Sequence, residues 1–451
     1  MTPTSSDLWF LPLGGCGEIG MNMNLYGHDG QWLMVDCGVT FAAPDAPPTE
    51  PHVQMADPRF IEERQQDLAG LVITHAHEDH IGAVAHLWTR LRCPVYTTPF
   101  SAEILRRKLG EVGMDGLVPI IIVPRSERRH IGVFDVEWVD LTHSIPEPSA
   151  LMIRTPAGSV FHTADWKLDP NPVLGDAYDP ERYRQLGAEA VTAMVCDSTN
   201  AVVPGHSVSE LALVAGLQDV VASATGRVVV TAFASNLARL VTLARVARET
   251  GRHLCLLGRS LNNMVSAARV TGLWPEEVIL VPPHDLAYFP RAAVLAIATG
   301  SQGEPRAALS RLARDRHPHL SLDAGDRVVF SARIIPGNEV EVGRLIQALQ
   351  ARDIEVITDE AHAVPIHASG HPAAEELQAM YGWILPEIAI PVHGEAEHIE
   401  ANAEIARTSG VPRQLRGRNG DLFFIAPIPG IRRDAAPVGR LGLQGEFLRS
   451  L

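Results

Sequence analysis

The feature that most constrains this fold is a dense run of metal-ligating side chains placed directly after a short apolar segment. The run reads His75-Ala76-His77-Glu78-Asp79-His80 and follows the mostly β-branched residues 71–74. Such a segment is typical of a buried strand, so the polar run is expected in the loop at its end. Imidazoles and carboxylates are ligands that Zn²⁺ and Mn²⁺ accept. This spacing favours a metal site over an ordinary solvated loop.

The order of residues within the run indicates two ions. In a loop that leaves a strand, residues two apart point the same way. We therefore expect His75 and His77 to bind one metal ion, while Asp79 and His80 face a second. Glu78 would point away from both and is given no role.

Four further apolar runs also end in a histidine or an aspartate. These residues are His143 after 133–141, Asp165 after 159–161, Asp197 after 193–196 and His393 after 388–390. We expect the strand ends to form one shared site. His143 would complete the first metal site, His393 the second, and Asp165 would bridge both ions. A bridged pair of ions generates hydroxide near neutral pH and clamps a phosphoryl group, so hydrolysis is the natural chemistry.

Between residues 205 and 360 the pattern changes to alternating strands and helices. The expected strands are 227–233, 253–257, 278–281, 293–298, 327–331 and 354–357, with helices such as 237–249 and 339–351 between them. This alternation predicts a mainly parallel α/β module. Because His393 follows the module and the other candidates precede it, the module is predicted to be inserted. The expected division is 1–204 and 361–451 for the first domain and 205–360 for the insertion.

Composition limits the other classes of protein to which the chain could belong. The formal net charge of −15 argues against a protein that coats nucleic acid with a wholly basic surface, although it allows a local basic groove. No segment has the length and hydropathy of a membrane span or signal peptide, so a cytoplasmic location is expected. The five scattered cysteines contain no C-x-x-C pair and indicate neither a disulfide framework nor a thiolate metal site.

A glycine motif near the N-terminus offers a competing interpretation. Gly15-Cys16-Gly17-Glu18-Ile19-Gly20 fits the dinucleotide-binding fingerprint, with Asp36 at the spacing of a ribose ligand. The fingerprint requires a helix next, whereas residues 22–33 alternate on both sides of a His28-Asp29-Gly30 turn and predict a hairpin. We therefore expect the glycines to let the backbone pass close beneath the metal site.

Beyond these patterns, the chain resembles ribonuclease J of the β-CASP branch of the metallo-β-lactamase superfamily. The resemblance covers nearly the whole chain to about residue 427 and rests on the order of its motifs, which are HAHEDH, LTHSIP, FHTADWKLD, CDSTN, AFASN, TGSQGEP, IPGNE, HASGHP and PVHGE. It implies an α/β fold, a metallo-β-lactamase αββα sandwich with an inserted, mainly parallel β-CASP domain. It also implies RNA as the substrate and two Zn²⁺ per chain, with Mn²⁺ as an alternative.

The resemblance implies roles for particular residues. One zinc would be held by His75, His77, His143 and Asp165, and the other by Asp79, His80, Asp165 and His393. Asp79, Asp197 and His371 are the implied catalytic residues, with His371 as general acid. The implied contacts to the substrate's terminal phosphate are Phe233, Ser235, Asn236, His367, Ser369, Gly370 and His371. From spacing alone, Ser235 and Asn236 fit a helix cap equally well.

Two departures from the family pattern bear on function. The family usually carries a further C-terminal domain, and this sequence stops where that domain would begin, so self-association stays open. The family's usual histidine two positions after Asn236 is Ala238 here. The expected activity is 5′ to 3′ hydrolysis of 5′-monophosphorylated RNA, with an endonuclease mode left open. The alternatives are a thioester or lactone metallo-hydrolase, since a fold does not fix a substrate, and a non-catalytic RNA-binding scaffold.

Overall fold

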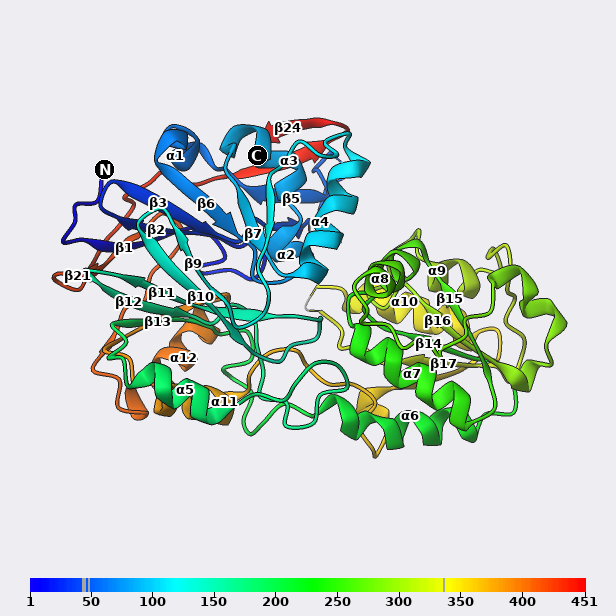
Figure 1. Cartoon of the computed structure of the whole chain (residues 1–451). Coiled ribbons are helices and arrows are strands. Elements are labelled where there is room, and N and C mark those ends of the chain that lie inside the picture. Colours follow the sequence, from blue (N-terminus) through cyan, green and yellow to red (C-terminus); the bar gives the residue numbers. More distant parts are fainter. Residues whose placement is uncertain (43–45, 48, 336) are drawn as a thin grey trace.

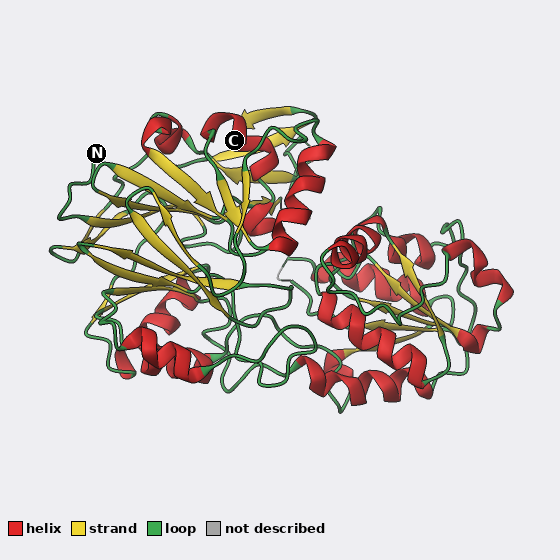
Figure 2. Ribbon diagram, viewed as in Figure 1, coloured by secondary structure: helices red, strands yellow, loops and turns green. Residues whose placement is uncertain are grey.

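The protein has two lobes, joined where the chain crosses between them (Figure 1). The computed structural model describes residues 1–42, 46–47, 49–335 and 337–451. In the larger lobe two sheets lie face to face and helices cover their outer sides (Figure 2). This is the αββα sandwich expected from the resemblance, with the α/β domain inserted into it.

The first sheet of the sandwich contains eight strands in the order β22-β21-β1-β2-β3-β6-β7-β8. Their bounds are β1 Leu8–Gly14, β2 Met23–His28, β3 Gln31–Val35, β6 Leu68–Val72, β7 Val95–Thr97, β8 Ile120–Ile122, β21 Leu422–Ala426 and β22 Gly430–Arg432. Its outer helices are α1 Arg59–Glu62, α2 Glu78–Ile81, α3 Val84–Leu91 and α4 Pro99–Glu111.

The second sheet contains seven strands in the order β20-β19-β13-β12-β11-β10-β9. Their bounds are β9 Arg128–Ile131, β10 Phe134–Asp140, β11 Ser149–Thr155, β12 Gly158–His162, β13 Ala193–Asp197, β19 Ile388–Val392 and β20 Arg413–Gln414. The helices α5 Pro180–Gly187, α11 Ala374–Ile384 and α12 Ala396–Thr408 cover its outer face (Figure 1).

Alternating strand residues build the layers of this lobe. Phe10 and Val72 from the first sheet pack with Trp138 and Ile390 from the second in one buried cluster. On the other face of the second sheet, the buried cluster contains residues of the sheet and of α5 and α11, among them Phe161, Tyr183 and Met380. Both faces of this sheet are therefore buried, as an αββα sandwich requires.

The inserted lobe is built on five parallel strands in the order β15-β16-β14-β17-β18. Their bounds are β14 Val228–Thr231, β15 His253–Leu257, β16 Val294–Ala298, β17 Arg327–Phe330 and β18 Glu355–Thr358. The helices of this lobe are α6 Leu213–Ala222, α7 Leu237–Glu249, α8 Arg259–Val270, α9 Ala308–Ala313 and α10 Glu339–Gln350.

Two sequence predictions are wrong in detail. The segment 278–281 forms only a single bridge, Leu280 with Leu254, because Pro275, Pro282 and Pro283 flank it and proline donates no backbone hydrogen bond. The loop expected for the polar run ends early, because α2 begins at Glu78 and α3 follows it. Asp79 and His80 thus lie in a helical turn instead of an extended loop.

The segment after the glycine motif tests the predicted hairpin. The hairpin is confirmed, since β2 and β3 pair antiparallel around Asp29-Gly30, and this excludes the helix that a dinucleotide site would need.

A small four-stranded sheet contains β4 Val39–Phe41, β5 Val53–Ala56, β23 Arg440–Gln444 and β24 Phe447–Ser450. All five cysteines are buried and unpaired. Within the described residues, every helix falls short of the length and apolar character that crossing a bilayer requires.

Candidate metal centre

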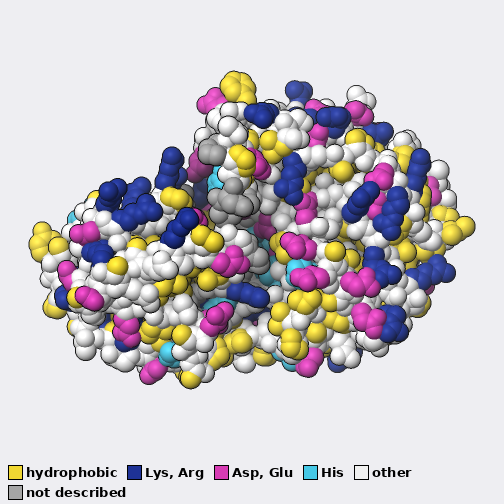
Figure 3. All heavy atoms as spheres, turned by 180° about the vertical axis from the view of Figure 1, so that it is seen from behind, with side chains coloured by type: hydrophobic (Ala, Val, Ile, Leu, Met, Phe, Trp, Pro, Cys, Tyr) yellow, Lys and Arg dark blue, Asp and Glu magenta, His cyan; other side chains and the backbone are white. Residues whose placement is uncertain are grey.

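The strand ends that carry histidine or aspartate meet at one edge of the sandwich. β12, β13 and β19 are mutually parallel, and β10 runs in the same direction because it is antiparallel to β11, which is antiparallel to β12. The residues that follow these strands, together with those after β6 of the facing sheet, therefore come to the same edge. Figure 3 shows histidine and acidic side chains in the hollow between the two lobes.

The first group of side chains is His75, His77, His143 and Asp165, whose ligand atoms all lie within 4.8 Å of one another. Nδ1 of His77 lies 3.1 Å from Nε2 of His75 and 3.0 Å from Nε2 of His143. A tetrahedral zinc ion with Zn–N bonds of about 2.05 Å would hold its nitrogens about 3.3 Å apart. The spacing therefore fits a cation of this size.

The hydrogen bonds behind these rings leave their lone pairs facing inward. Nδ1 of His143 donates to the carbonyl oxygen of Gly370 at 2.5 Å. Nδ1 of His75 lies 3.0 Å from Oγ1 of Thr74, whose own proton goes to Asp36. Both Nε2 atoms are thus free to coordinate. Burial, reinforced by neighbouring imidazoles, lowers the pKa of His75 and of His143 well below the usual value, so both rings are neutral.

The second group is Asp79, His80, Asp165 and His393, and it shares Asp165 with the first. Nε2 of His80 lies 3.2 Å from Oδ2 of Asp165, and Nε2 of His393 lies 3.2 Å from Oδ2 of Asp79. Burial lowers the pKa of His80, but the carboxylates of Asp165, Asp79 and Asp36 outweigh it and raise that pKa well above the usual value. This concentration of negative charge equally favours a divalent cation.

Close backbone packing fixes the loops of the second group. The backbone N–H of His393 donates to the carbonyl oxygen of Gly15 at 2.6 Å. A Cβ on Gly15 would lie 2.2 Å from Oδ1 of Asn22, and one on Gly38 would lie 1.7 Å from the carbonyl oxygen of Asp79. The glycine-rich turn therefore passes directly against the metal loops, as the sequence predicts.

Asp197 and His371 form a hydrogen-bonded pair beside the two groups. Nδ1 of His371 donates to Oδ2 of Asp197 at 2.8 Å, while Oδ1 of Asp197 accepts from the backbone N–H and Oγ1 of Thr199. Burial lowers the pKa of His371, but Asp197 and Asp165 raise it above the usual value overall. The carboxylate thus orients the imidazole and favours its protonated form, as a general acid requires.

The expected phosphate contacts come from two loops. Ser369 and Gly370 lie at the metal centre, since Oγ of Ser369 accepts from Nδ2 of Asn200 at 2.8 Å and Gly370 bonds His143. Phe233, Ser235 and Asn236 lie between β14 and α7, and Oδ1 of Asn236 accepts from the backbone N–H of Arg239 at 2.9 Å. Asn236 is therefore a helix cap, and its role toward substrate stays a prediction.

His367 lies in the loop that links the inserted domain to the metal centre. Its Nδ1 is buried and has no hydrogen-bond partner within the described part of the chain. Burial, with a contribution from Arg239, lowers the pKa of His367 to about 3, so the ring is neutral. Nδ1 is therefore a buried polar atom whose hydrogen-bonding capacity is unmet.

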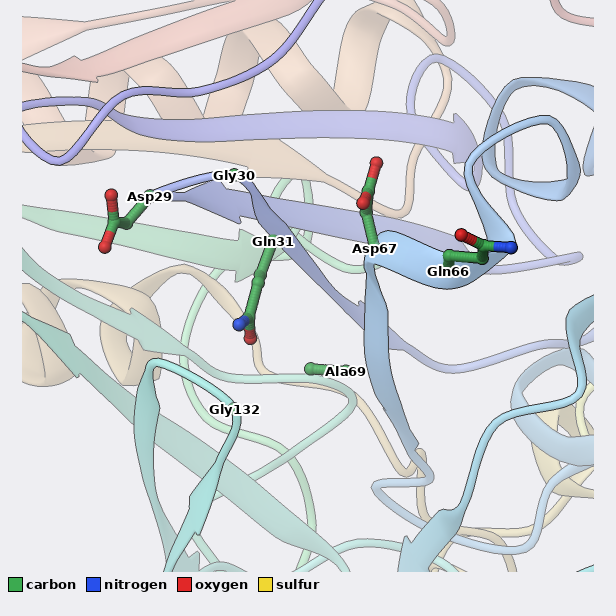
Figure 4. A pocket seen from close by; sticks show the side chains of 7 residues that line it. All are labelled: Asp29, Gly30, Gln31, Gln66, Asp67, Ala69 and Gly132. Atoms are coloured by element: carbon green, nitrogen blue, oxygen red, sulfur yellow. The ribbon is translucent and has the colours of Figure 1, made fainter.

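A separate open depression, shown in Figure 4, has a volume of about 480 Å³. It is lined by Asp29, Gly30, Gln31, Gln66, Asp67, Ala69 and Gly132. Asp67 precedes β6 and Gly132 precedes β10, whereas His75 and His143 follow those strands. The depression thus lies at the opposite edge of the sandwich and contributes nothing to the metal centre.

The sequence reasoning missed the residues that hold the candidate ligands. Asp36 is fully buried, and its Oδ2 accepts from Nδ1 of His80 at 2.7 Å. Thr74 supports His75, and Oγ1 of Thr199 lies 3.1 Å from Nδ1 of His393. Asp36 directly follows β3, so the rule that identified the other strand ends would have found it.

Three family descriptions match successive parts of the chain. Residues 17–206 match the metallo-beta-lactamase superfamily. Residues 225–349 match "Ribonuclease J, beta-CASP domain", and residues 360–413 match "Zn-dependent metallo-hydrolase RNA specificity domain". A solved structure of a protein of unknown function from Enterococcus faecalis V583 superimposes with a TM-score of 0.65 at 16% identity. It covers 93% of this chain and 100% of that one, which shows the fold alone.

Curated relatives match almost the entire chain. Ribonuclease J of Sinorhizobium meliloti is 46% identical over 98% of this chain and 78% of its own length. Ribonuclease J of Mycolicibacterium smegmatis is 39% identical over 96% and 77%, and that of Mycobacterium tuberculosis is 36% identical over 98% and 79%. With this identity and coverage, and with both domains of the fold present, the chain belongs to the ribonuclease J family.

Proposed function

We propose that this protein is a metal-dependent ribonuclease that hydrolyses RNA phosphodiester bonds. The observation that carries the proposal is the pair of His/Asp groups that share Asp165. Membership of the ribonuclease J family supports RNA as the substrate. We also propose that residues 1–204 and 361–451 form the catalytic domain and that residues 205–360 form the inserted one.

Two Zn²⁺ ions are the proposed cofactors, with Mn²⁺ as the alternative. His75, His77, His143 and Asp165 would hold one ion, and Asp79, His80, Asp165 and His393 the other. Five imidazoles with short carboxylates form the mixed nitrogen and oxygen donor set that suits both metals. Ions bound there would supply Lewis acidity toward the phosphoryl oxygens and a nucleophilic water at neutral pH.

Protein side chains would then position the substrate and move the proton. His371, oriented by Asp197, would donate its proton to the leaving oxygen of the cleaved phosphodiester. About 23% of its side-chain surface is exposed, so a substrate in the hollow can reach it. His367, Ser369 and Gly370 lie on the same loop as His371 and are proposed to contact the 5′-terminal phosphate, with Phe233, Ser235 and Asn236.

The proposed direction is 5′ to 3′ from a 5′-monophosphate end. The test compares degradation of one RNA prepared with a 5′-monophosphate, with a 5′-triphosphate and as a closed circle. Rapid release of mononucleotides from the monophosphate form alone supports the proposal. Equal rates on all three RNAs would leave a ribonuclease that does not read the 5′ end, and intact RNA in all three would refute the function itself. Metal analysis of protein purified without chelator identifies the ions.

A further inference from the structure

The inserted sheet has a point where its connections diverge. In the order β15-β16-β14-β17-β18, the chain leaves β14 through α7 toward β15 and leaves β17 through α10 toward β18. These two connections run to opposite sides, so the crevice at the carboxyl ends of β14 and β17 is the place where open parallel sheets bind ligands. The loop after β14 carries Ser235 and Asn236. The loop after β17 carries Arg333, which no role described above includes.

Arg333 is linked through one side chain to the loop of the candidate general acid. Its Nη1 donates to Oδ1 of Asn200 at 3.4 Å. Nδ2 of the same asparagine donates to Oγ of Ser369 at 2.8 Å and to the carbonyl oxygen of His371 at 3.3 Å. The guanidinium thus lies beside the residues proposed to contact the substrate's terminal phosphate.

The backbone that carries Arg333 is held by the loop after β16, which is the second strand from β17 in the sheet. Gln302 follows β16, and its Nε2 donates to the carbonyl oxygen of Arg333 at 2.9 Å. Oε1 of Gln302 accepts from the backbone N–H of Ile335 at 2.8 Å. The base of the arginine is therefore fixed while its exposed side chain remains free to meet a ligand.

Charge balance distinguishes Arg333 from the other cations of this region. Burial and the fields of Arg239, Arg333 and Lys167 lower the pKa of His367, which places all three cations near that ring. Arg239 is neutralised by Glu210, at 2.5 Å, and Lys167 by Asp169, at 3.2 Å.

Arg333, in contrast, has no carboxylate within 4.0 Å among the described residues. It contributes an uncompensated positive charge in a chain whose net charge is −15.

We propose that Arg333 binds the 5′-terminal phosphate of the RNA and is a specificity-determining residue of this enzyme. The inference rests on the proposed function and extends it. A guanidinium offers paired N–H donors that match two phosphate oxygens. A terminal phosphate monoester carries roughly −1.5 to −2 charges at pH 7, whereas a 5′-hydroxyl carries none. Arg333 therefore favours monophosphorylated over hydroxyl ends, in addition to the neutral donors beside it.

The test measures equilibrium binding of one short oligoribonucleotide bearing either a 5′-monophosphate or a 5′-hydroxyl. The protein is full length, loaded with metal, and carries Asp79→Asn so that the RNA is not consumed. Arg333→Gln and Arg333→Lys are compared in this background. The matched control is Arg344→Gln, because Arg344 lies on the exposed surface of α10 in the same domain and pairs with Glu341.

We expect Arg333→Gln to weaken binding of the monophosphorylated oligonucleotide about 10- to 100-fold, the usual range for losing a charged hydrogen bond. Binding of the hydroxyl form should change less than about 3-fold on the same scale. Arg333→Lys should recover part of the loss, and Arg344→Gln should cause none. An equal loss on both oligonucleotides, no loss on either, or no preference in the parent protein would overturn the inference.

Failure of the proposed function gives a different result. If the protein with Asp79 restored leaves RNA intact while Arg333→Gln still removes the monophosphate preference, the ribonuclease proposal fails and the role of Arg333 stands. If RNA is degraded from 5′-monophosphate ends and Arg333→Gln keeps the preference, the function stands and the role of Arg333 fails.

Discussion

Replacing Asp36 by asparagine removes one charge from behind the second metal group and leaves the side-chain shape almost unchanged. Asp36 bonds His80 through Oδ2 at 2.7 Å and the backbone N–H of Thr74 through Oδ1 at 2.9 Å, and Oγ1 of Thr74 donates to the same carboxylate. An asparagine can turn its single side-chain oxygen toward either His80 or Thr74, but not toward both. Its NH₂ group then faces either Nδ1–H of His80 or the donors of Thr74.

The expected magnitude follows from the lost contact. A hydrogen bond to a charged group contributes about 1.5–3 kcal/mol, and loss of a partner behind a metal ligand typically weakens metal binding about 10- to 100-fold. The two figures agree, since each tenfold change corresponds to about 1.4 kcal/mol. We expect the main loss at the ion held by Asp79, His80 and His393. A smaller loss is expected at the other ion, because Thr74 also contacts His75.

The assay is a competition between protein and a chromogenic chelator that resolves the two bound ions. Asp57→Asn is the matched control, because Asp57 is also a buried carboxylate of this domain but bonds Arg59 instead of a metal group. The reasoning is refuted if Asp36→Asn keeps both ions at wild-type affinity, or if Asp57→Asn loses them equally.

Three further predictions concern the centre itself. Asp79→Ala should abolish turnover and spare RNA binding, and an unchanged rate in a nuclease assay would contradict its role as a ligand. His371→Gln should lower kcat about 100- to 10,000-fold, the range for general acid catalysis, with little change in KM or metal content; loss of the ions in this variant would point to a structural role. Chelation should lower the melting temperature and added Zn²⁺ should restore it, because a ligand at 100 times its Kd stabilises the folded state by about 2.7 kcal/mol. An unaltered melting curve would show that no ion is bound.

The residues at the strand ends could be predicted from the sequence because one local rule locates them. A short β-branched run identifies the strand, and parallel strands bring their carboxyl ends to one edge. His143, Asp165, Asp197 and His393 all follow from this rule. Whether they serve as ligands and catalytic groups stays a prediction that metal analysis must test.

Local sequence rules fail where a contact between distant parts of the chain determines what a residue does. Asn236 fits both a phosphate contact and a helix cap, and only its hydrogen bond to Arg239 shows the cap. Arg333 has no local pattern that marks it. Its position depends on Gln302 from the loop after β16 and on Asn200 from the other domain. Such contacts join residues 31 and 133 positions apart, which no motif spans.

The pairing of Asp197 with His371 depends on where the inserted domain leaves and rejoins the sandwich. β13 and β19 are adjacent parallel strands, so the insertion between them leaves their pairing intact. The chain departs at the carboxyl end of β13, immediately after Asp197, and returns through the loop of His371 before α11 carries it back to the start of β19. Both crossings therefore lie at the metal-centre edge. The Asp197–His371 hydrogen bond therefore joins the segment through which the chain leaves the sandwich to the loop through which it returns.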